Sequence, residues 1–529
     1  MATLLFLGAS VSQLPVIRYA REAGHRVVAA DGDPNAVAFG FTDVAVNVDF
    51  TDVDEVVAAV KELGVEGVLA VSSDRAVLPA AEIACVLGLP GIGAEVARAM
   101  TDKTVMRSRL EAADVPQPRY AVLTRESDAR AVVETIPLPA VLKPADSGGQ
   151  RGLFMIEEPA DVVDHLAEAL SFSPSGRAML EEYVDGIELN GIIVVRGGEP
   201  TLLTLSDRLR PPGLGFGVGW IHRYPSSLER SVLDRVRDVA FDAVRVLGLR
   251  DGIAFPQLIA TGDDVRLIEI AARIAAGQMA DLVRFGTGIE LFDVAIAQAL
   301  GRPVSDALVI PSAQRPIAIH FLTASPGVLP LGTVSAISGL DVVRSSPGVL
   351  DASLYFDVGA TITPLQVDAD RRGYVVATGE TAEEALALAE EAARKLVVRM
   401  RPSLRGLRAR RVLLPTAGAA LAGIAAASAL FAFDGGIRPH LISETIRVRG
   451  ALLQVRYVFN EPVRAFLIVN GKPATSASPL RKSGALRWRR RGGSRMQLAI
   501  EGTDRAGRSA VVSLSPARAA VSARRPAAT

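Results

Sequence analysis

Short apolar runs alternate with amphipathic stretches over the first 90 residues of the chain. Three runs have the length and composition of buried strands: 3–9, 25–31 and 65–74. Three further stretches repeat apolar residues at helical spacing: 11–24, 53–64 and 76–89. Repeated β–α units of this kind build a parallel sheet covered by helices. Residues 1–98 are therefore predicted to form a first α/β domain.

From Thr101 onward strands and helices no longer alternate strictly, which is typical of an α+β arrangement. Predicted helices are 101–115 and 227–248. Predicted strands are 137–145, 178–184, the two arms of a hairpin over 188–206, 253–261 and 265–271. We assign residues 99–305 to a second domain and 306–400 to a further lobe. Near the end of that lobe, Thr381 and Glu384 have the spacing of a capping box.

Residues 412–433 contain no charged side chain, and five arginines precede them within 401–411. A helix of this length would reach about 33 Å, enough for the roughly 30 Å hydrocarbon core of a bilayer. The basic flank predicts that the preceding part of the chain lies in the cytoplasm. The sequence thus predicts a single-pass membrane protein with residues 434–515 outside the cytoplasm; a buried helix rich in alanine and glycine is the alternative.

The C-terminal part differs sharply in charge from the rest of the chain. The whole sequence has a formal net charge of zero, yet residues 401–529 hold 23 Lys and Arg against 5 Asp and Glu. Short alternating runs within 434–515 predict a small β-sandwich, and 501–515 resembles the closing strands of bacterial immunoglobulin-like domains. Residues 516–529 are predicted to be a disordered tail.

The densest basic stretch of this part is 486–495. Outside the cytoplasm it predicts binding to an anionic envelope polymer or to lipid headgroups. A nucleic acid becomes the natural partner only if the membrane topology is different.

The chain has a single cysteine, Cys85, which excludes an internal disulfide. It lies in an apolar stretch with helical spacing. We therefore expect a buried structural thiol there.

Candidate chemistry begins with a glycine-rich segment at 146–153. The preceding strand carries Lys143, and Ser147, Gly148, Gly149 and Gly152 free backbone N–H groups to surround an anion. A nearby lysine suits a phosphate. The segment does not fit the Walker pattern, and a plain glycine hairpin is the alternative.

Two acids flank a short apolar pair in the segment 181–188. Glu181 precedes Tyr183 and Val184, and Glu188 follows a tight Asp–Gly turn. One carboxylate could accept a hydrogen bond from an adenine amino group and the other from ribose hydroxyls. A solvated acidic hairpin is the alternative.

The segment 267–279 places an acid, Glu269, at the end of an apolar run and a cation, Arg273, four residues later. A buried charge is costly unless it is paired or bound to a metal. The two side chains therefore either pair with each other or face a ligand.

Five segments, in their order along the chain, resemble the stations of the ATP-grasp superfamily of carboxylate–amine ligases. They are 101–103, 141–152, 181–188, 255–273 and 370–379. The acid-to-arginine form of 269–273 resembles the L-amino-acid ligase branch, within a biotin carboxylase-like group. The likeness covers about residues 1–400 and implies an ATP-grasp domain with a preceding α/β domain and a C-terminal lobe.

The resemblance implies roles for individual residues. Lys103 and Lys143 would contact the α- and β-phosphates of ATP while the glycine-rich loop closes over them. Glu181 would meet the adenine amino group, the backbone near Tyr183 and Val184 the ring, and Glu188 the ribose.

The resemblance also implies Mg²⁺ or Mn²⁺ as a cofactor beside ATP. Family metal sites take one acid from each of two adjacent strands, and here the two positions are Gln257 and Glu269, twelve residues apart. An amide oxygen can ligate Mg²⁺, although with less charge than a carboxylate. Ala271 stands where many members carry an asparagine. Arg273 would steady the acyl-phosphate and the tetrahedral intermediate.

A glycine- and proline-rich segment, 206–226, is predicted to be a mobile substrate lid, with an ordinary surface loop as the alternative. It carries Arg208, Arg210, His222 and Arg223. Among these we expect Arg208 and His222 to contact substrate. Asp74, at the end of a predicted strand, is a further candidate for substrate binding.

The sequence therefore predicts a membrane-anchored, ADP-forming ligase that activates a carboxylate as an acyl-phosphate and joins it to an amine, with Arg273 and Lys143 as catalytic residues. One alternative is a nucleotide-binding regulator or scaffold that has lost catalysis, which Gln257 and Ala271 favour. Another is a bicarbonate-using carboxylase. The expected partners are small-molecule carboxylates and amines, and a homo-oligomer is compatible with the sequence.

Overall fold

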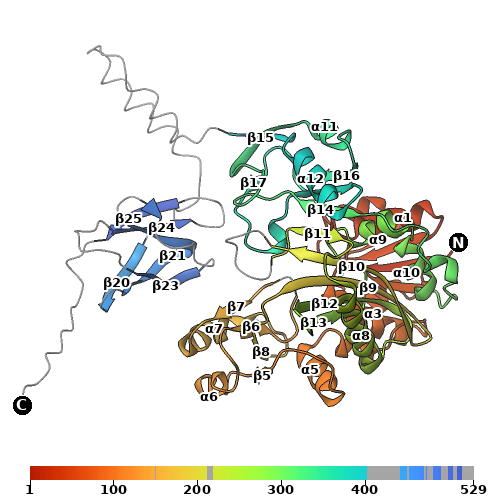
Figure 1. Ribbon diagram of the computed structural model, residues 1–529, viewed down its shortest axis with the longest axis horizontal. Coiled ribbons are helices and arrows are strands. Elements are labelled where there is room, and N and C mark those ends of the chain that lie inside the picture. The colour runs from red at the N-terminus through yellow and green to blue at the C-terminus, as the bar shows by residue number, and fades with distance from the viewer. Residues whose placement is uncertain are drawn as a thin grey trace, which may run out of the picture. The chain divides into compact units, whose positions relative to one another are not determined.

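The computed structural model describes residues 1–148, 150–210 and 218–401 with their side chains, and further along the backbone of six strands between 441 and 514. The chain divides into two compact units, Met1–Leu407 and Arg408–Thr529 (Figure 1). The predicted membrane span 412–433, most of its basic flank and the tail 516–529 lie outside the described residues. Within the part that is described, no helix is both long enough and apolar enough to span a bilayer.

The first domain is a four-stranded parallel sheet covered by helices, as the alternating pattern predicts. Its strand order is β3-β2-β1-β4, with bounds β1 Thr3–Leu7, β2 Arg26–Ala30, β3 Val44–Val46 and β4 Gly67–Ala70. Its helices are α1 Leu14–Glu22, α2 Val53–Val60, α3 Val77–Val86 and α4 Ala94–Ala99. The three-residue strand β3 and the short helix α4 have no counterpart in the predicted pattern.

Cys85 corrects one expectation, because its thiol is exposed rather than buried. On α3 the buried positions include Ala81 and Ala84. Cys85 follows Ala84 directly, so it lies about 100° further around the helix and faces away from the core.

Residues 120–182 form a four-stranded antiparallel sheet of their own with the order β5-β8-β6-β7. The strands are β5 Tyr120–Leu123, β6 Ala140–Pro144, β7 Phe154–Ile156 and β8 Ala178–Glu182. Helices α6 Ala129–Val133 and α7 Pro159–Ser171 pack with this sheet around one apolar cluster. The glycine-rich segment is therefore the connection of the β6–β7 hairpin.

A larger antiparallel sheet has eight strands in the order β13-β12-β9-β10-β11-β14-β18-β16. Their bounds are β9 Ile187–Arg196, β10 Glu199–Leu209, β11 Ile221–Tyr224, β12 Gly252–Thr261, β13 Asp264–Ala271, β14 Ile317–Phe321, β16 Val349–Leu354 and β18 Gly373–Thr378. The predicted hairpin is confirmed as β9–β10, which turns at Gly197 and Gly198, both with positive φ. Because β11 pairs with β14, this sheet continues across residue 305 and joins the second domain to the C-terminal lobe.

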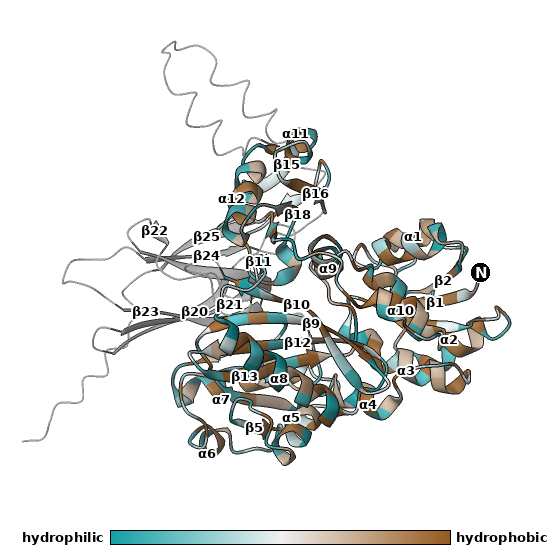
Figure 2. Ribbon diagram, turned by 45° about the vertical axis from the view of Figure 1, so that its right-hand side comes forward, coloured by the Kyte–Doolittle hydropathy of each residue, from teal (hydrophilic) through white to brown (hydrophobic). Residues whose placement is uncertain are grey.

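Four helices accompany the large sheet, and one of them, α10, also packs against the first domain. They are α5 Lys103–Ala112, α8 Arg230–Leu247, α9 Met279–Thr287 and α10 Leu291–Ala299. The long helix α8 buries a stripe that includes Val236, Ala240 and Leu247. Its mixed colouring in Figure 2 is that of a helix with one buried and one solvated face.

The rest of the C-terminal lobe is a three-stranded antiparallel sheet, β17-β15-β19, with two helices. The elements are β15 Gly332–Ser338, β17 Thr361–Ile362, β19 Val397–Met400, α11 Leu340–Arg344 and α12 Ala382–Ala393. The predicted N-cap of α12 is confirmed, because Thr381 Oγ1 accepts a hydrogen bond from the Glu384 amide at 3.1 Å.

The second unit contains only strands in its described part, and all their pairings are antiparallel. The strands are β20 Leu441–Arg449, β21 Leu452–Val469, β22 Lys472–Pro473, β23 Arg481–Arg489, β24 Leu498–Thr503 and β25 Ser509–Leu514. The all-β content agrees with the sequence pattern. An immunoglobulin-like sandwich stays a prediction, since its side-chain packing lies outside the described residues.

Candidate active site

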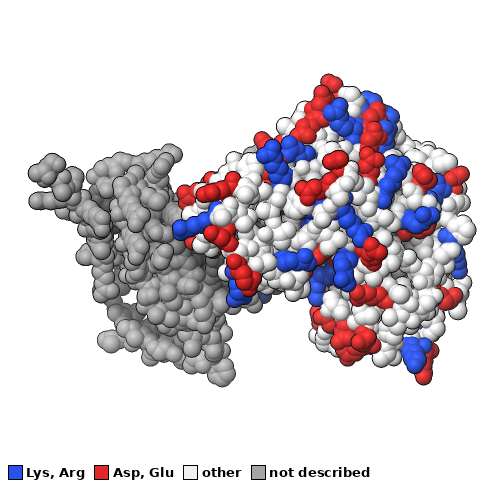
Figure 3. Space-filling model, turned by 90° about the horizontal axis from the view of Figure 1, so that it is seen from below, with Lys and Arg blue, Asp and Glu red and all other residues white. Residues whose placement is uncertain are grey.

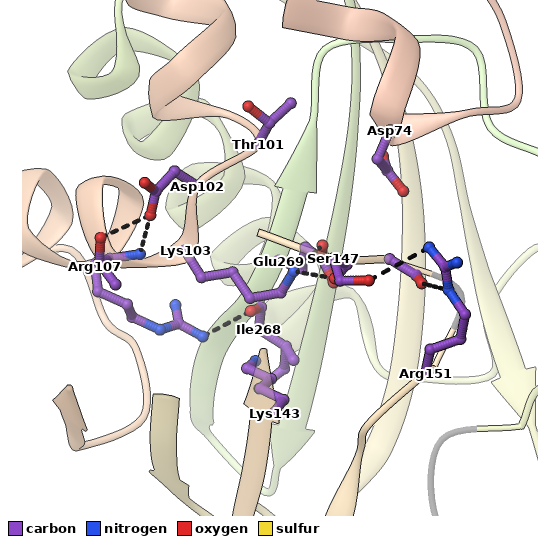
Figure 4. Close-up of polar contacts among 12 residues, drawn as sticks. Asp74, Thr101, Asp102, Lys103, Arg107, Lys143, Ser147, Arg151, Ile268 and Glu269 are labelled. Carbon is purple, nitrogen blue, oxygen red and sulfur yellow. Dashed lines mark hydrogen bonds and ion pairs between the residues drawn. The ribbon is translucent and has the colours of Figure 1, made fainter. Parts of the chain in front are cut away.

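Three predicted site residues meet where the small sheet faces the large one. Lys103 opens α5, Lys143 lies on β6, and Glu269 lies near the end of β13. Lys103 Nζ is 3.1 Å from Glu269 Oε1 and donates to the Ser147 carbonyl, also at 3.1 Å. Figure 4 shows Lys103 reaching between Glu269 and Ser147, with Lys143 beneath them. The structure therefore brings the metal, phosphate and glycine-rich-loop positions together.

Strand register places Lys143 beside Glu181. Glu181 on β8 is opposite Val141, and Met179 is opposite Lys143. Since alternate residues of a strand share a face, Lys143 and Glu181 point to the same side as diagonal neighbours. Lys143 Nζ lies 2.7 Å from Glu181 Oε2, and both side chains are buried.

Arg107 completes this contact and was missed from the sequence. Its Nε is 3.0 Å from Glu181 Oε1, and its Nη2 is 3.2 Å from Glu181 Oε2. It also donates to the carbonyls of Leu267 at 3.0 Å and Ile268 at 2.6 Å. Arg107 lies one helical turn after Lys103, so this i, i+4 spacing was the available signal. A fully buried guanidinium thus joins α5, β8 and β13.

The charges of this group depend on one another. Burial raises the pKa of Glu181, but the attraction of Arg107 and Lys143 outweighs burial and lowers this pKa to about 2. Burial lowers the pKa of Lys143, and although Glu181 opposes this effect, Arg107 and Lys103 add to it. Glu181 is thus ionised at neutral pH and engaged by two cations through both oxygens. Its predicted contact with the adenine amino group stays a prediction.

Glu269 and Arg273 have separate partners. Burial raises the pKa of Glu269, but Lys103 outweighs it and the pKa is lowered overall. Arg273 Nε and Nη2 each lie 2.7 Å from Asp74 Oδ1, and Asp74 follows β4 of the first domain. The alternative of a direct Glu269–Arg273 pair is wrong, because Glu269 pairs with Lys103 and Arg273, which lies just after the end of β13, pairs with Asp74.

Asp74 also lies against the glycine-rich loop. A Cβ on Gly148 would lie 2.8 Å from Asp74 Oδ2, closer than a side chain tolerates. Gly152 has φ +70° and a Cβ there would be 2.7 Å from the Phe172 ring. Neighbouring side chains approach both backbone positions so closely that only glycine fits there. A plain glycine hairpin would not need glycine for this reason. Gly149 lies outside the described residues.

Gln257 on β12 is opposite Glu269 on β13, so the two residues predicted to hold a metal are cross-strand neighbours. Gln257 Nε2 donates to Asn190 Oδ1 at 3.3 Å, which leaves the amide oxygen to act as a ligand. No group of three or more His, Cys, Asp or Glu side chains suited to a metal occurs in the described part of the chain. Mg²⁺ commonly takes one or two protein ligands and completes its shell with phosphates and water. One carboxylate and one amide oxygen fit that mode.

The predicted ribose ligand Glu188 lies at the start of β9 and contacts two arginines. Arg208 Nη1 is 2.6 Å from Glu188 Oε2, and Arg210 Nη2 is 2.6 Å from Glu188 Oε1. The Tyr183 amide donates to the Pro139 carbonyl at 3.0 Å. Contacts of Glu188 with ribose and of the Tyr183–Val184 backbone with adenine stay predictions.

Two parts of the predicted lid 206–226 belong to strands of the large sheet. Residues 206–209 belong to β10 and 221–224 to β11, and Asp207 is opposite Arg223. The lid prediction is wrong for these parts, because their backbone groups are engaged in the strand ladder; residues 211–217 lie outside the described ones. Arg223 pairs with Asp207 at 2.7 Å and with Glu383 at 3.1 Å.

Four positively charged side chains and three carboxylates thus form one contiguous group. We call it the phosphate-side cluster: Asp74, Lys103, Arg107, Lys143, Glu181, Glu269 and Arg273. On the exterior of residues 1–401, by contrast, Figure 3 shows acidic and basic side chains interspersed over the visible face.

Comparison with known proteins gives two family matches. Residues 102–307 match the carbamoyl-phosphate synthase L chain, ATP binding domain, and residues 321–401 match L-amino acid ligase C-terminal domain 2. The second match lies on the C-terminal lobe, and the first ends near the boundary predicted at residue 305.

Individual relatives agree with these matches. A D-alanine–D-alanine ligase of Desulforudis audaxviator is 30% identical over 200 residues, covering 35% of this chain and 63% of that protein. A phosphoribosylamine–glycine ligase of Leifsonia xyli subsp. xyli is 28% identical over 410 residues, covering 74% of this chain and 95% of that one. The chain thus spans less than two thirds of the first ligase, and another curated relative is covered over 60% of its length.

Among solved structures, an L-amino acid ligase from Bacillus licheniformis superposes with a TM-score of 0.65. Its sequence identity is 20%, and the alignment covers 76% of this chain and 99% of that one. At this identity the likeness shows the fold alone. Residues 102–307 and 321–401 are thus similar to the ATP-binding domain of the carbamoyl-phosphate synthase L chain and to a domain of L-amino acid ligases, and the chain shares its fold with a solved L-amino acid ligase.

Proposed function

We propose that the chain is an ATP-dependent ligase that activates a carboxylate as an acyl-phosphate and joins it to an amine. The observation that carries this proposal is the convergence of Lys103 on α5, Lys143 on β6, Glu269 near the end of β13 and Arg273 just after it. Phosphoryl transfer to a carboxylate needs its phosphate oxygens to be neutralised and its reacting groups to be held in place. The two lysines would contact the phosphates, Glu269 and the Gln257 amide would hold the metal, and the Arg273 guanidinium would face the carboxylate.

In the first step, a carboxylate oxygen of the substrate attacks the γ-phosphate of ATP, forming the acyl-phosphate and ADP. Lys103 and Lys143 neutralise phosphate charge, and the loop at 146–153 surrounds it with backbone N–H groups. Glu269 and the Gln257 amide oxygen would hold Mg²⁺, which supplies further charge neutralisation when bound. Positioning and electrostatic stabilisation carry most of the rate in such transfers.

In the second step, the amine attacks the acyl carbon and phosphate leaves through a tetrahedral oxyanion. Arg273 is the cation proposed to stabilise that oxyanion. Its Nε and Nη2 already contact Asp74 at 2.7 Å, so its orientation is set before substrate binds. Removing one donor of this kind typically costs about 10²–10³ in rate.

The test is ADP release by the full-length chain with Mg-ATP, with and without a pool of small carboxylates and amino acids. The Arg273→Ala variant is compared with Arg266→Ala, an arginine on β13 that pairs with Asp264 at 2.8 Å and with Glu182, neither of which belongs to the phosphate-side cluster. Pool-dependent ADP release that Arg273→Ala loses and Arg266→Ala keeps would support the ligase. Loss of ATP binding in Arg273→Ala would contradict the assigned role.

A second candidate function is a nucleotide-binding regulator, favoured by the amide at Gln257 and by Ala271 in place of a ligating side chain. Tight ATP binding without pool-dependent ADP release would move the assignment toward this candidate.

We also propose that residues 412–433 anchor the chain in a membrane, with residues 1–400 in the cytoplasm and the basic C-terminal unit on the other side. The support is the uncharged span and its arginine-rich flank. Protease accessibility of the C-terminal unit in sealed vesicles tests the topology. Binding of that unit to anionic rather than neutral vesicles tests the proposed lipid or polymer partner.

A further inference from the structure

A second charged group lies on the C-terminal side of the site. We call it the C-lobe cluster: Glu188, Arg208, Arg210, His222, Asp368 and Arg371. Three guanidinium groups face two carboxylates in it, so it carries an excess of positive charge. Asn190 joins this cluster to the phosphate-side cluster, because its side chain contacts both His222 and Gln257, and Gln257 is opposite Glu269.

Arg371 is the buried centre of the C-lobe cluster. Its Nη2 is 2.7 Å from Asp368 Oδ1, and its Nε donates to the Gly219 carbonyl at 2.9 Å, which also accepts from Nη2. The guanidinium carbon is 4.2 Å from the centre of the Phe321 ring. The side chain is only 10% exposed, yet its Nη1 has no hydrogen-bond partner among the residues that the structure describes.

Nη1 points toward a bare stretch of backbone at Gly277. A Cβ built on Gly277 would lie 3.5 Å from Arg371 Nη1, 3.6 Å from His222 Nε2 and 3.4 Å from Phe321. Gly277 has φ +73°, a conformation that favours glycine. The missing side chain leaves room for a ligand group between a guanidinium nitrogen and an imidazole nitrogen.

His222 is held as a hydrogen-bond donor toward the same place. Asn190 Oδ1 accepts from Gln257 Nε2, so the Asn190 amide nitrogen is the atom 3.2 Å from His222 Nδ1 and donates to it. Burial lowers the pKa of His222 well below its usual value, and Arg371 and Arg208 add to this effect. The ring is therefore neutral, with its single proton on Nε2. Two donors, Arg371 Nη1 and His222 Nε2, thus face one empty position.

The chemistry of that position is specific. Burial lowers the pKa of Arg371 to about 10, with Asp368 opposing and Arg208 adding to this effect, so Arg371 is still charged at neutral pH. A buried cation with a free N–H beside a neutral donor favours an anionic oxygen acceptor. A carboxylate, with two oxygens, can accept from both donors. An ammonium group would be disfavoured there, because it cannot accept a hydrogen bond from either donor and the cluster already carries excess positive charge.

We propose that Arg371 Nη1 and His222 Nε2, over the bare backbone of Gly277, bind a carboxylate of the amine substrate, so that this substrate is an amino acid or a short peptide. The inference rests on the proposed function and deepens it. The reacting carboxylate has its own cation in Arg273, which precedes Gly277 by four residues. The anion bound at Arg371 therefore belongs to the second substrate.

The test separates the two chemical steps. Hydroxylamine displaces phosphate from an acyl-phosphate to give a hydroxamate, and it carries no carboxylate. The full-length chain is given Mg-ATP, a pool of small carboxylates and either hydroxylamine, a pool of L-amino acids or the corresponding amino-acid amides. Arg371→Gln and Arg371→Lys are compared with Arg394→Ala, a control whose side chain is 64% exposed at the C-cap of α12.

For the wild type we expect ADP release with amino acids to exceed that with their amides. In Arg371→Gln the KM for amino acids should rise about 10- to 100-fold, the equivalent of one lost charged hydrogen bond. Hydroxamate formation should fall by less than about threefold, and Arg371→Lys should recover part of the loss. Equal use of amino acids and amides by the wild type would overturn the inference. So would a parallel loss of hydroxamate, which would place the acid substrate on Arg371.

Calorimetry keeps the two proposals distinguishable. Absence of hydroxamate with every pool acid would defeat the ligase assignment. Binding of the amino-acid pool and of the amide pool to the chain loaded with ADP and Mg²⁺ then decides the subsite separately. Tighter binding of amino acids that Arg371→Gln loses supports it, and equal binding of the two pools refutes it.

Discussion

The phosphate-side cluster and the C-lobe cluster differ in how completely their charges are paired. In the first, Lys103, Lys143, Arg107 and Arg273 each contact a carboxylate directly. In the second, Arg371 contacts Asp368 through one nitrogen, while its Nη1 has no partner in the described part of the chain. A paired cluster is held in its geometry before ATP binds, whereas a cluster with a free donor can accept a new anion without breaking an existing ion pair.

The difference follows from the elements that carry the side chains. Lys143, Glu181 and Glu269 lie on sheet strands, where register fixes which residues face each other. Arg371 precedes β18, and Gly277 lies between β13 and α9, outside regular structure. Loops carried by a rigid sheet are where ligand-specific contacts concentrate. We therefore expect substitutions in the phosphate-side cluster to affect stability and the chemical step, and those in the C-lobe cluster to affect substrate choice.

The largest expected effect is from Arg107→Met. This change leaves the buried Glu181 carboxylate with Lys143 alone and removes the donors to the Leu267 and Ile268 carbonyls. Breaking a buried ion pair typically costs about 3–5 kcal/mol of unfolding free energy. Chemical denaturation measures it. The control is Arg109→Met, two residues along α5, whose pair with the 83% exposed Glu95 should be worth less than about 1 kcal/mol. Equal losses would contradict the assigned role of Arg107.

Next in size is the effect of Arg273→Ala on the rate. We expect turnover to fall about 10²–10³-fold because the oxyanion loses its guanidinium donor. The dissociation constant for ATP should change little, since Lys103, Lys143 and the glycine-rich loop are untouched. Steady-state ADP release and fluorescence binding of a labelled ATP analogue separate the two quantities. An intact rate in this variant would remove Arg273 from the chemistry.

Two neighbouring acids on β8, Glu181 and Glu182, should differ in how much they contribute to stability at acid pH. The Glu181 pKa of about 2 in the folded chain is below its usual value of 4.5, so its ionised form stabilises the fold above about pH 4.5. That contribution is lost as the pH falls from 4.5 through 2. Glu181→Gln should lower stability at neutral pH and flatten its dependence on pH in this window.

The control for Glu181→Gln is Glu182→Gln on the same strand. Glu182 faces Arg266 and the 74% exposed Arg119. Its substitution should lower stability less and leave the acid dependence near that of the wild type. Denaturant midpoints measured between pH 3 and pH 7 give both quantities. Superimposable curves for the two variants would show that Glu181 has no special place in the cluster.

The smallest expected effect is on the Mg²⁺ requirement, and it tests the proposed metal ligand Gln257. Gln257→Glu restores a second carboxylate opposite Glu269 and adds charge to the donor set, which should lower the Mg²⁺ concentration for half-maximal ADP release about 3- to 10-fold. Titration of Mg²⁺ at constant ATP measures the shift. Asn190 loses a hydrogen-bond donor in this variant, so Gln257→Ala serves as a control for that loss. An unchanged Mg²⁺ requirement would exclude Gln257 from the metal's surroundings.

The sequence by itself determined the local elements and the pairs that lie on neighbouring strands. The β–α alternation of residues 1–98 predicts the parallel sheet. The resemblance to ATP-grasp ligases singles out Gln257 and Glu269 on two strands of one short hairpin, and a β-bulge between Gln257 and Leu258 sets the register that places them opposite each other. The resemblance assigns the two lysine stations, and the sequence pattern places Lys103 in a helix and Lys143 near the end of a strand. These are local rules, and the fold preserves them.

Tertiary structure alone decided the partners of the charges. Asp74 meets Arg273 across 199 residues, Arg107 reaches Glu181 across 74, and Arg371 meets Gly277 from the other lobe. Even the exposure of Cys85 depends on which side of α3 faces the sheet. A sequence pattern fixes which way a side chain leaves its own strand or helix, but not which distant side chain fills the space it enters. That choice is made when whole sheets and domains pack, and here it produced both charged clusters of the site.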